Sequence, residues 1–378
     1  EAILDEGLKM LEGEPPANAK TLYFVLSFIA NPDRGMNKQP RLERLIKLQN
    51  LLLKQNPDPR LYREIADTLQ RMEKYDEAAT TLVQMIEKYP NEKNGRTLGV
   101  IAELQRRAGK PEAALETATQ AIQADGNDAE LQRVYAEILG DGGKVDEAVA
   151  ALRKAVASEP EDPRYKLLLG GLFARYGRND EAIKVFQEVL KQYPNQDELL
   201  RITHSNLSIV YVNQGDYAKG EAELEVLFQK TPDDPGVNND LGYLYADQGK
   251  NLEKAETMIR KAVQDDPERP AYLDSLGWVL FKRGKAKDAL EPLQKAVELQ
   301  KLEEQKGLAP PDATIREHLG DVLAHLQEVL KAQEMWAEAE RIAAKAVPPD
   351  KRLPEIRKKL DSLKELGSIP KNSSSENP

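Results

Sequence analysis

The sequence has 378 residues, a net charge of -10 at pH 7 and no cysteine. Without thiols it forms no disulfide, holds no cysteine-based zinc site and uses no thiolate nucleophile. Its negative charge argues against nucleic-acid binding. Ala, Leu, Glu, Lys and Gln dominate while aromatic residues make up 6%, which predicts an all-α protein. The longest apolar run, 22–30, is shorter than the roughly 20 residues of a membrane helix.

The N-terminal region predicts a divergent helical cap over 1–56. The stretch AKTLYFVLSFIA (19–30) is expected to form one helix and RLERLIKLQNLLLKQNP (41–57) a second, with a loop at 31–40 between them. The chain begins with Glu1 rather than Met, so we expect that a segment before it has been trimmed.

From 57 to 346 the sequence repeats itself with a period near 34 residues. LGYLYADQGKNLEKAETMIRKAV (241–263) is followed by LGWVLFKRGKAKDALEPLQKAV (276–297). Eight units start near 59, 95, 129, 163, 201, 235, 270 and 313. A small residue recurs on the second predicted helix of each unit: Ala78, Ala114, Ala148, Ala182, Gly220, Ala255, Ala289 and Ala332. Another recurs on the first: Ala66, Ala102, Ala136, Gly170, Ser208, Gly242, Gly277 and Gly320.

These markers predict stacked helical hairpins. Small residues on both helices let the two backbones approach closely. A glycine between the helices is expected to take the left-handed conformation that ends the first helix. It recurs as Gly109, Gly143, Gly177, Gly215, Gly249 and Gly284. Each hairpin has an apolar face that it buries only by stacking on its neighbours.

Two units are longer than the rest. DELL (197–200) adds four residues before the fifth unit, which predicts an extra helical turn, and EEQKGLAPP (303–311) predicts a loop before the eighth. After the repeats, LPEIRKKLDSLKEL (353–366) predicts a polar helix that ends at Gly367 and caps the array within 347–367. Residues 368–378 are expected to form a disordered tail.

The repeat resembles the tetratricopeptide (TPR) pattern over roughly 59–346. The resemblance implies a right-handed α-solenoid whose first helices line a concave groove for protein partners. A narrower resemblance covers NNDLGYLYADQGK, LDSLGWVL and HLGDVL in the last three units. These phrases are similar to those of bacterial envelope TPR lipoproteins, some of which are adaptors of carboxy-terminal-processing proteases. This implies a bacterial envelope or periplasmic location, with a cytoplasmic one left open.

Mapping the family's inward positions onto this sequence gives two candidate partner-binding sets. The arginine set, expected to receive an acidic segment, is Arg96, Arg106, Arg107, Arg133, Arg164 and Arg175, with Glu103, Glu137 and Asp141 among them. The aromatic set, expected to hold an extended peptide, is Asn238, Asn239, Tyr243, Asp247, Asp274, Trp278, Phe281, Glu317, Asp321 and His325.

The sequence leaves alternatives to a non-enzymatic scaffold or adaptor. One is a structural subunit that assembles through convex or terminal surfaces, with homo-oligomers possible. Another is a metal-dependent enzyme that uses His318, Asp321 and His325, which share one predicted helix face. No nucleophile motif or phosphate loop is present, so we expect no catalytic residue, cofactor or metal. The partner is expected to be a protein and not a nucleic acid.

Overall fold

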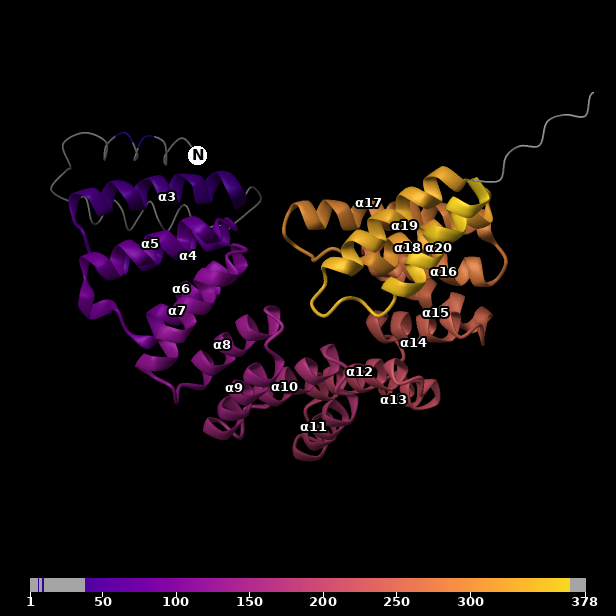
Figure 1. Cartoon of the computed structure of the whole chain (residues 1–378), viewed down its shortest axis with the longest axis horizontal. Coiled ribbons are helices and arrows are strands. Elements are labelled where there is room, and N and C mark those ends of the chain that lie inside the picture. Colours follow the sequence, from indigo (N-terminus) through magenta and orange to yellow (C-terminus); the bar gives the residue numbers. More distant parts are fainter. Residues whose placement is uncertain (1–5, 7–8, 10–37, 368–378) are drawn as a thin grey trace, which may run out of the picture. The chain divides into compact units, whose positions relative to one another are not determined.

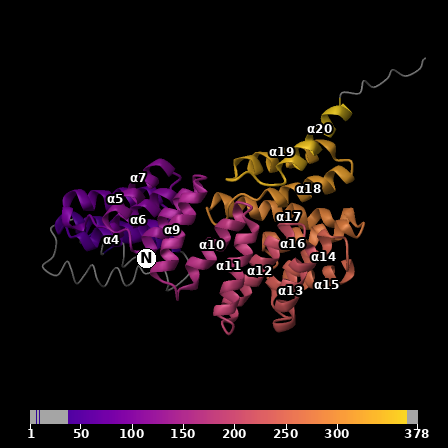
Figure 2. The ribbon, with the colours of Figure 1, turned by 60° about the horizontal axis from the view of Figure 1, so that its bottom comes forward.

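The computed structural model describes residues 6, 9 and 38–367. Every regular element among them is helical, which confirms the all-α prediction. The chain divides into two compact units, unit 1 (Glu1–Leu169) and unit 2 (Gly170–Pro378). Within each unit, antiparallel helical hairpins pack against the next hairpin along the chain (Figure 1; Figure 2).

Unit 1 contains the first predicted repeats and the helix before them. Its elements are α3 (Lys38–Gln55), α4 (Pro59–Arg71), α5 (Tyr75–Lys88), the 3-10 turn η2 (Pro90–Glu92), α6 (Gly95–Arg107), α7 (Pro111–Ala124), α8 (Ala129–Asp141), α9 (Val145–Ser158) and the start of α10 (Pro163–Arg175). The first helices of its repeats are α4, α6, α8 and α10.

Unit 2 begins within α10 and contains the remaining repeats. Its further elements are α11 (Asn179–Gln192), α12 (Asp197–Asn213), α13 (Tyr217–Lys230), α14 (Pro235–Asp247), α15 (Leu252–Asp265), α16 (Pro270–Lys282), α17 (Ala286–Gln305), α18 (Ala313–His325), α19 (Val329–Lys345) and α20 (Leu353–Gly367). The first helices here are α10, α12, α14, α16 and α18.

The first helices start where the sequence predicts, because an acidic or amide side chain caps most of them. The Asp58 carboxylate accepts a hydrogen bond from the Arg60 N–H, and the Asn94 side chain accepts one from the Thr97 N–H. Asp128, Asp234 and Asp312 do the same for α8, α14 and α18. In α12 the residues at 197–200 form the predicted extra turn.

The turns between paired helices are left-handed as predicted. All six predicted glycines have φ between 69° and 82°. In the first and eighth repeats, Glu73 (φ 59°) and Gln327 (φ 64°) take the same place without glycine. The turn geometry is therefore a property of the repeat, and glycine is the residue that adopts it at least cost.

The small residues mark the closest contacts between paired helices. A Cβ added to Gly277 would lie 2.3 Å from Leu293 Cγ, and one added to Gly320 would lie 2.4 Å from Trp336 Cδ1. The matching alanines of the second helices, such as Ala289 and Ala332, have no exposed surface. The two helices of a hairpin therefore pack closely where a small residue of one helix faces a large side chain of the other.

Two boundaries differ from the sequence prediction. Helix α17 continues to Gln305, so Glu303 to Gln305 are helical where a loop was predicted, and the chain turns at Gly307 (φ 68°). Helix α3 starts at Lys38, inside the predicted loop 31–40. The helix predicted at 19–30 and the tail predicted at 368–378 lie outside the described residues. The division into domains stays a prediction.

Candidate protein-binding grooves

Unit 1 carries a groove along the first helices of its repeats. A cavity of about 900 Å³ lies along α6, α8 and the start of α10, and one of about 410 Å³ lies along α4 and α6. Both are lined by Gln70, Arg96, Val100 and Leu104. The two cavities therefore form one continuous surface over four consecutive hairpins, which we call the unit 1 groove.

Two arginines of the arginine set are joined by carboxylates. The Arg106 guanidinium donates to both Glu103 oxygens, at 2.8 and 3.0 Å, and to Asp141 at 2.9 Å. It also lies 3.5 Å from Glu137, whose other oxygen accepts from Arg133. The hydrogen bond to Glu103 is the main cause that raises the pKa of Arg106. Burial alone would lower the pKa of Arg133, but its bonds to Glu130 and the charge of Glu137 raise it.

Three others make further contacts. Arg96 pairs with Asp128, with 3.1 Å between Nε and Oδ2, and its side chain is 85% exposed. Arg107 lies over the ring of Tyr75 at 4.9 Å and shares Glu103 with Arg106, with 3.8 Å between its Nε and Oε1 of Glu103. Arg164 forms a forked pair with Asp162.

The larger cavity has a mixed charge instead of the expected basic one. Its lining includes three guanidinium groups and five carboxylates: Arg96, Arg133, Arg164, Glu103, Asp125, Asp128, Glu130 and Glu159. The inward arginines are matched by acidic side chains on the same or the next helix. Pairing of this kind fixes the side chains in place and cancels the net charge that would attract an acidic segment.

The prediction missed an apolar centre in this groove. Val100 lies in both cavities and is 50% exposed, although it is large and apolar. It is the sixth residue of its first helix, where the next two units carry Val134 and Leu168 and most other units carry a polar residue. That run of apolar residues at one position was the signal available in the sequence.

In unit 2, four residues of the aromatic set, Tyr243, Trp278, Phe281 and His325, form a chain of ring contacts that runs through His318. Trp278 stacks on His318 with 4.0 Å between ring centroids and 11° between planes. His318 Nδ1 lies 3.0 Å from both oxygens of Asp274. Tyr243 lies 6.0 Å from His318. Phe281 extends the chain from Trp278 to His325, at 5.6 and 5.4 Å. Burial raises the pKa of Tyr243, so it stays a neutral phenol.

This cluster is less accessible than the sequence predicts. Trp278 is only 8% exposed and Asn239 only 7%. Trp278 Nε1 and Asn239 Oδ1 are buried without a hydrogen-bond partner among the described residues. Asn238 has a structural role, because its amide donates at 2.8 Å to the carbonyls of Pro232 and Asp234, just before the start of α14.

The remaining predicted residues contact the C-terminal part of the chain. Lys359 Nζ of α20 donates to Glu317 Oε1 at 2.7 Å and to the Asp321 oxygens at 2.7 and 2.8 Å. Burial alone would lower the pKa of Lys359, but the charge of Asp321 raises it. The Arg175 Nε donates to the Val347 carbonyl at 2.8 Å. Arg175 belongs to unit 2 and is therefore not part of the unit 1 groove, whereas the other five arginines of the arginine set lie in unit 1.

The three residues considered for a metal have different partners. His318 is bound to Asp274, Asp321 accepts from Trp336 Nε1 at 2.9 Å, and His325 packs edge-on against Phe281. Within the described residues, no three His, Cys, Asp or Glu side chains form a group that could hold a metal ion. A search of the same residues finds no helix with the length and apolarity needed to cross a membrane.

Comparison with known proteins supports the repeat pattern. A family model described as "Tetratricopeptide repeat" matches 63–129, 136–197 and 239–304, which is just over half of the chain. A second model of the same description matches 173–239. The TPR repeat-containing protein PA4667 of Pseudomonas aeruginosa is 35% identical over 135 residues, which are 36% of this chain. The match spans 20% of that relative's length.

Solved structures share the fold at low sequence identity. A human IFIT1 dimer with m7Gppp-AAAA has a TM-score of 0.50 and 17% identity, and the match covers 97% of this chain and 84% of the other. The APC/C hetero-tetramer Cut9-Hcn1 has a TM-score of 0.50 and 13% identity over 97% of this chain and 87% of the other. At these identities the likeness concerns the stacking of helices alone.

Proposed function

Because the chain belongs to the tetratricopeptide-repeat family, we propose that it is a non-enzymatic scaffold that holds a segment of a partner protein against its first helices. The family's repeats are protein-interaction modules, and such a surface is built from many shallow contacts. Contacts of this kind typically give micromolar affinity, about -8 kcal/mol per module.

The unit 1 groove is the observation that carries this proposal. Its two cavities join into one surface along α4, α6, α8 and α10. At its centre lies Val100, an exposed apolar side chain surrounded by fixed ion pairs such as Arg106 with Glu103. An apolar centre with a polar rim is the arrangement found at protein interfaces. The partner segment is therefore expected to place an apolar side chain on Val100 and polar groups at the rim.

We further propose that the protein acts as an adaptor in the bacterial envelope, and two observations support this. The last three repeats carry the phrases that resemble envelope TPR lipoproteins and adaptors of carboxy-terminal-processing proteases. The P. aeruginosa relative is also bacterial. The match covers 20% of that relative's length, so the partner and the compartment are proposed from the phrases and from the relative's bacterial source, and not from that protein's own function.

Site-specific photo-crosslinking tests the proposed function. Among the helices of the groove only α10 carries a lysine, Lys166, so amine-reactive reagents would report on one end of the groove at most. We would place p-benzoylphenylalanine at Val100, or at Val226 on α13 as the control. Val226 is 40% exposed and lies on a second helix. A protein captured from native lysate through position 100 and not through 226 supports the groove. Equal capture at both positions, or capture at 226 alone, contradicts it.

The runner-up is an assembly subunit, and one observation favours it. Leu302 and Leu308 are 44% and 65% exposed beside a cavity of about 590 Å³ at the end of α17. Apolar side chains gathered at one surface are typical of contacts between subunits. Light scattering of Leu302→Lys with Leu308→Lys distinguishes the two functions, because the molar mass of an assembly subunit should fall and that of a groove scaffold should not.

A further inference from the structure

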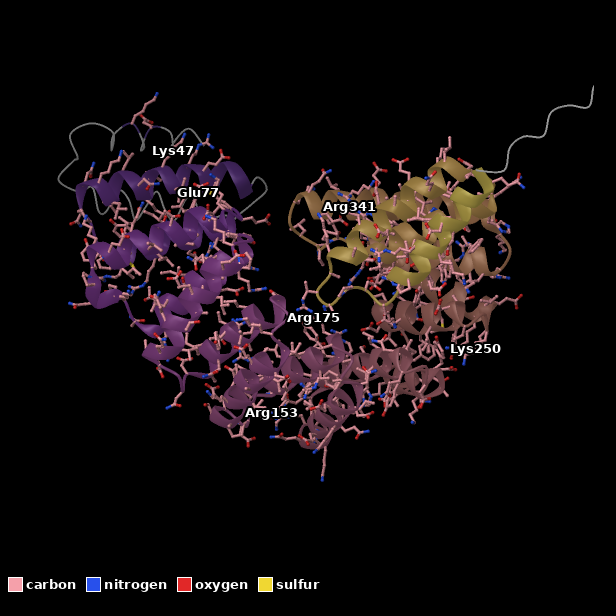
Figure 3. The ribbon with its side chains drawn as sticks, viewed as in Figure 1. Lys47, Glu77, Arg153, Arg175, Lys250 and Arg341 are labelled. Carbon is pink, nitrogen blue, oxygen red and sulfur yellow. The ribbon has the colours of Figure 1, made fainter. Side chains whose placement is uncertain are left out.

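A short segment between the last two helices crosses unit 2 and contacts distant first helices. We call residues 346–352, between α19 and α20, the strap (Figure 1). Its Val347 carbonyl accepts from Arg175 Nε, and its Lys351 Nζ donates to Asn213 Oδ1. Arg175 and Asn213 are the last residues of α10 and α12. Figure 3 shows Arg175 beside the strap.

The other end of the strap binds inward residues of α18. Arg352 Nη1 donates to Thr314 Oγ1 and lies 3.8 Å from Glu317 Oε2. Thr314 and Glu317 occupy the second and fifth positions of their first helix, which the repeat places on the inner face. The strap therefore contacts the first helices of unit 2 through one backbone carbonyl and two consecutive basic side chains. The Nε and Nη2 of Arg352 bind Asp350 within the strap, which leaves Nη1 to reach α18.

The strap is held less firmly than the helix after it. Val347 is 41% exposed, and Lys351 is also exposed. Beneath the strap lies a cavity of about 700 Å³, lined on the other side by Tyr176, Asn179 and Asn213. By contrast, α20 is anchored by Ile356, which has no exposed surface and packs in one apolar cluster with Trp336. The strap can therefore leave its place while α20 stays docked.

We propose that the inner face of unit 2 recognises a basic, proline-containing segment of a partner protein, and that the strap occupies this site until such a segment replaces it. The proposal rests on the proposed scaffold function and names a partner class for its second surface. The strap sequence AVPPDKR (346–352) gives the expected chemistry: a proline-containing stretch, bent at 346–348, that is followed by two basic residues. Proline restricts the backbone in advance. Lys351 meets the Asn213 amide oxygen, and Nη1 of Arg352 reaches Thr314 and lies 3.8 Å from Glu317.

The strap makes the site selective because it competes from within the chain. A tethered segment acts at an effective concentration on the order of millimolar. A partner segment must compete with the tethered strap for the same site, so basic peptides of low affinity do not bind while the strap is in place. Removing the strap's two basic contacts is expected to open the site and strengthen binding of the same peptide at least tenfold.

Fluorescence anisotropy of the full chain tests this inference. The probe is a labelled peptide of sequence AVPPDKRL, acetylated and amidated at its ends. The wild type is compared with the double variant Lys351→Ala, Arg352→Ala, in which the strap is released. We expect the released variant to bind the peptide at least tenfold more tightly. A third variant that adds Asn213→Ala to the released variant should bind the peptide no more tightly than the wild type does. A control peptide with Glu-Glu in place of Lys-Arg should not bind.

Two results would overturn the inference. One is equal peptide affinity of the wild type and the released variant while circular dichroism shows both folded. The other is a released variant that does not bind the peptide and has twice the molar mass of the wild type in light scattering. That result would mean that a second copy of the chain occupies the site. Neither result touches the unit 1 groove, because capture through Val100 is measured separately. Failure of the strap and failure of the scaffold function are therefore distinguishable.

Discussion

At the scale of single residues, neighbouring glycines in α10 have opposite surroundings. A Cβ on Gly170 would lie 2.5 Å from Phe186 Cε1, and Phe186 has no exposed surface and little freedom to move. A Cβ on Gly171 would meet nothing within 4 Å. Gly170 is therefore required by helix packing, whereas Gly171 only adds freedom to the unfolded chain.

This contrast predicts opposite effects of the same substitution. Gly170→Ala should destabilise the protein by about 1–3 kcal/mol, because the added methyl overpacks the hairpin. Gly171→Ala should stabilise it by about 0.5–1 kcal/mol, the usual gain of alanine over glycine inside a helix. Urea denaturation of the two variants measures both values. Equal destabilisation by both would show that Phe186 does not define the packing of α10.

The two tryptophans of the chain make a second matched pair. Trp336 Nε1 donates to Asp321 at 2.9 Å, whereas Trp278 Nε1 has no partner among the described residues. A hydrogen bond to a charged group contributes about 1.5–3 kcal/mol. Both substitutions remove similar volume from buried sites, so Trp336→Phe should cost more stability than Trp278→Phe by about that amount. Thermal unfolding measures the difference, and an equal cost would mean that the Asp321 bond contributes nothing.

The sequence predicted single residues well where the repeat determines them. Ala78 and its equivalents are buried, and the marked glycines adopt positive φ, because every hairpin places the same demand on the same position. It did not predict the pairing of Arg106 with Asp141 or the burial of Trp278. Those depend on how one hairpin stacks on the next, and the spacing of small residues does not predict that geometry.

At the scale of elements, capping explains why helix starts were easier to predict than helix ends. Asp58 and Asp128 each cap a first helix at the residue expected from the repeat. The loop predicted at 303–311 starts three residues too early, because Glu303 to Gln305 continue α17 and the chain turns at Gly307. A loop that contains glycine and two prolines shows that the helix must end, but it does not show at which of the preceding residues.

The turn between α18 and α19 offers an element-scale prediction. Gln327 holds a left-handed conformation in which the side chain of an L-residue is strained. Gln327→Gly should relieve the strain and stabilise the protein by about 1 kcal/mol. The reverse change, Gly284→Gln, should destabilise it similarly, because Gly284 has φ 77° and nothing near its Cβ position. Denaturation midpoints test both, and a loss of stability in Gln327→Gly would contradict the account.

At the scale of the whole molecule, the strap makes contacts that are far less local than those of the hairpins. The hairpins are built from neighbours in the sequence, which is why the fold could be predicted. The strap joins Val347 to Arg175 across 172 positions, and no repeat rule predicts it. The unit 1 groove arises only when four hairpins stack, so the exposure of Val100 had to be seen in the structure, although the run of apolar residues at its repeat position is visible in the sequence.

The central claim is that the first helices of unit 1 hold the partner. The most direct test compares Val100→Asp with Val226→Asp as baits in quantitative capture from native lysate. Both substitutions place a carboxylate at an exposed valine, one in the groove and one on a second helix. We expect at least a tenfold loss of the captured partner for Val100→Asp, with wild-type capture retained by Val226→Asp. Wild-type capture by both variants, or loss from both, would contradict the central claim.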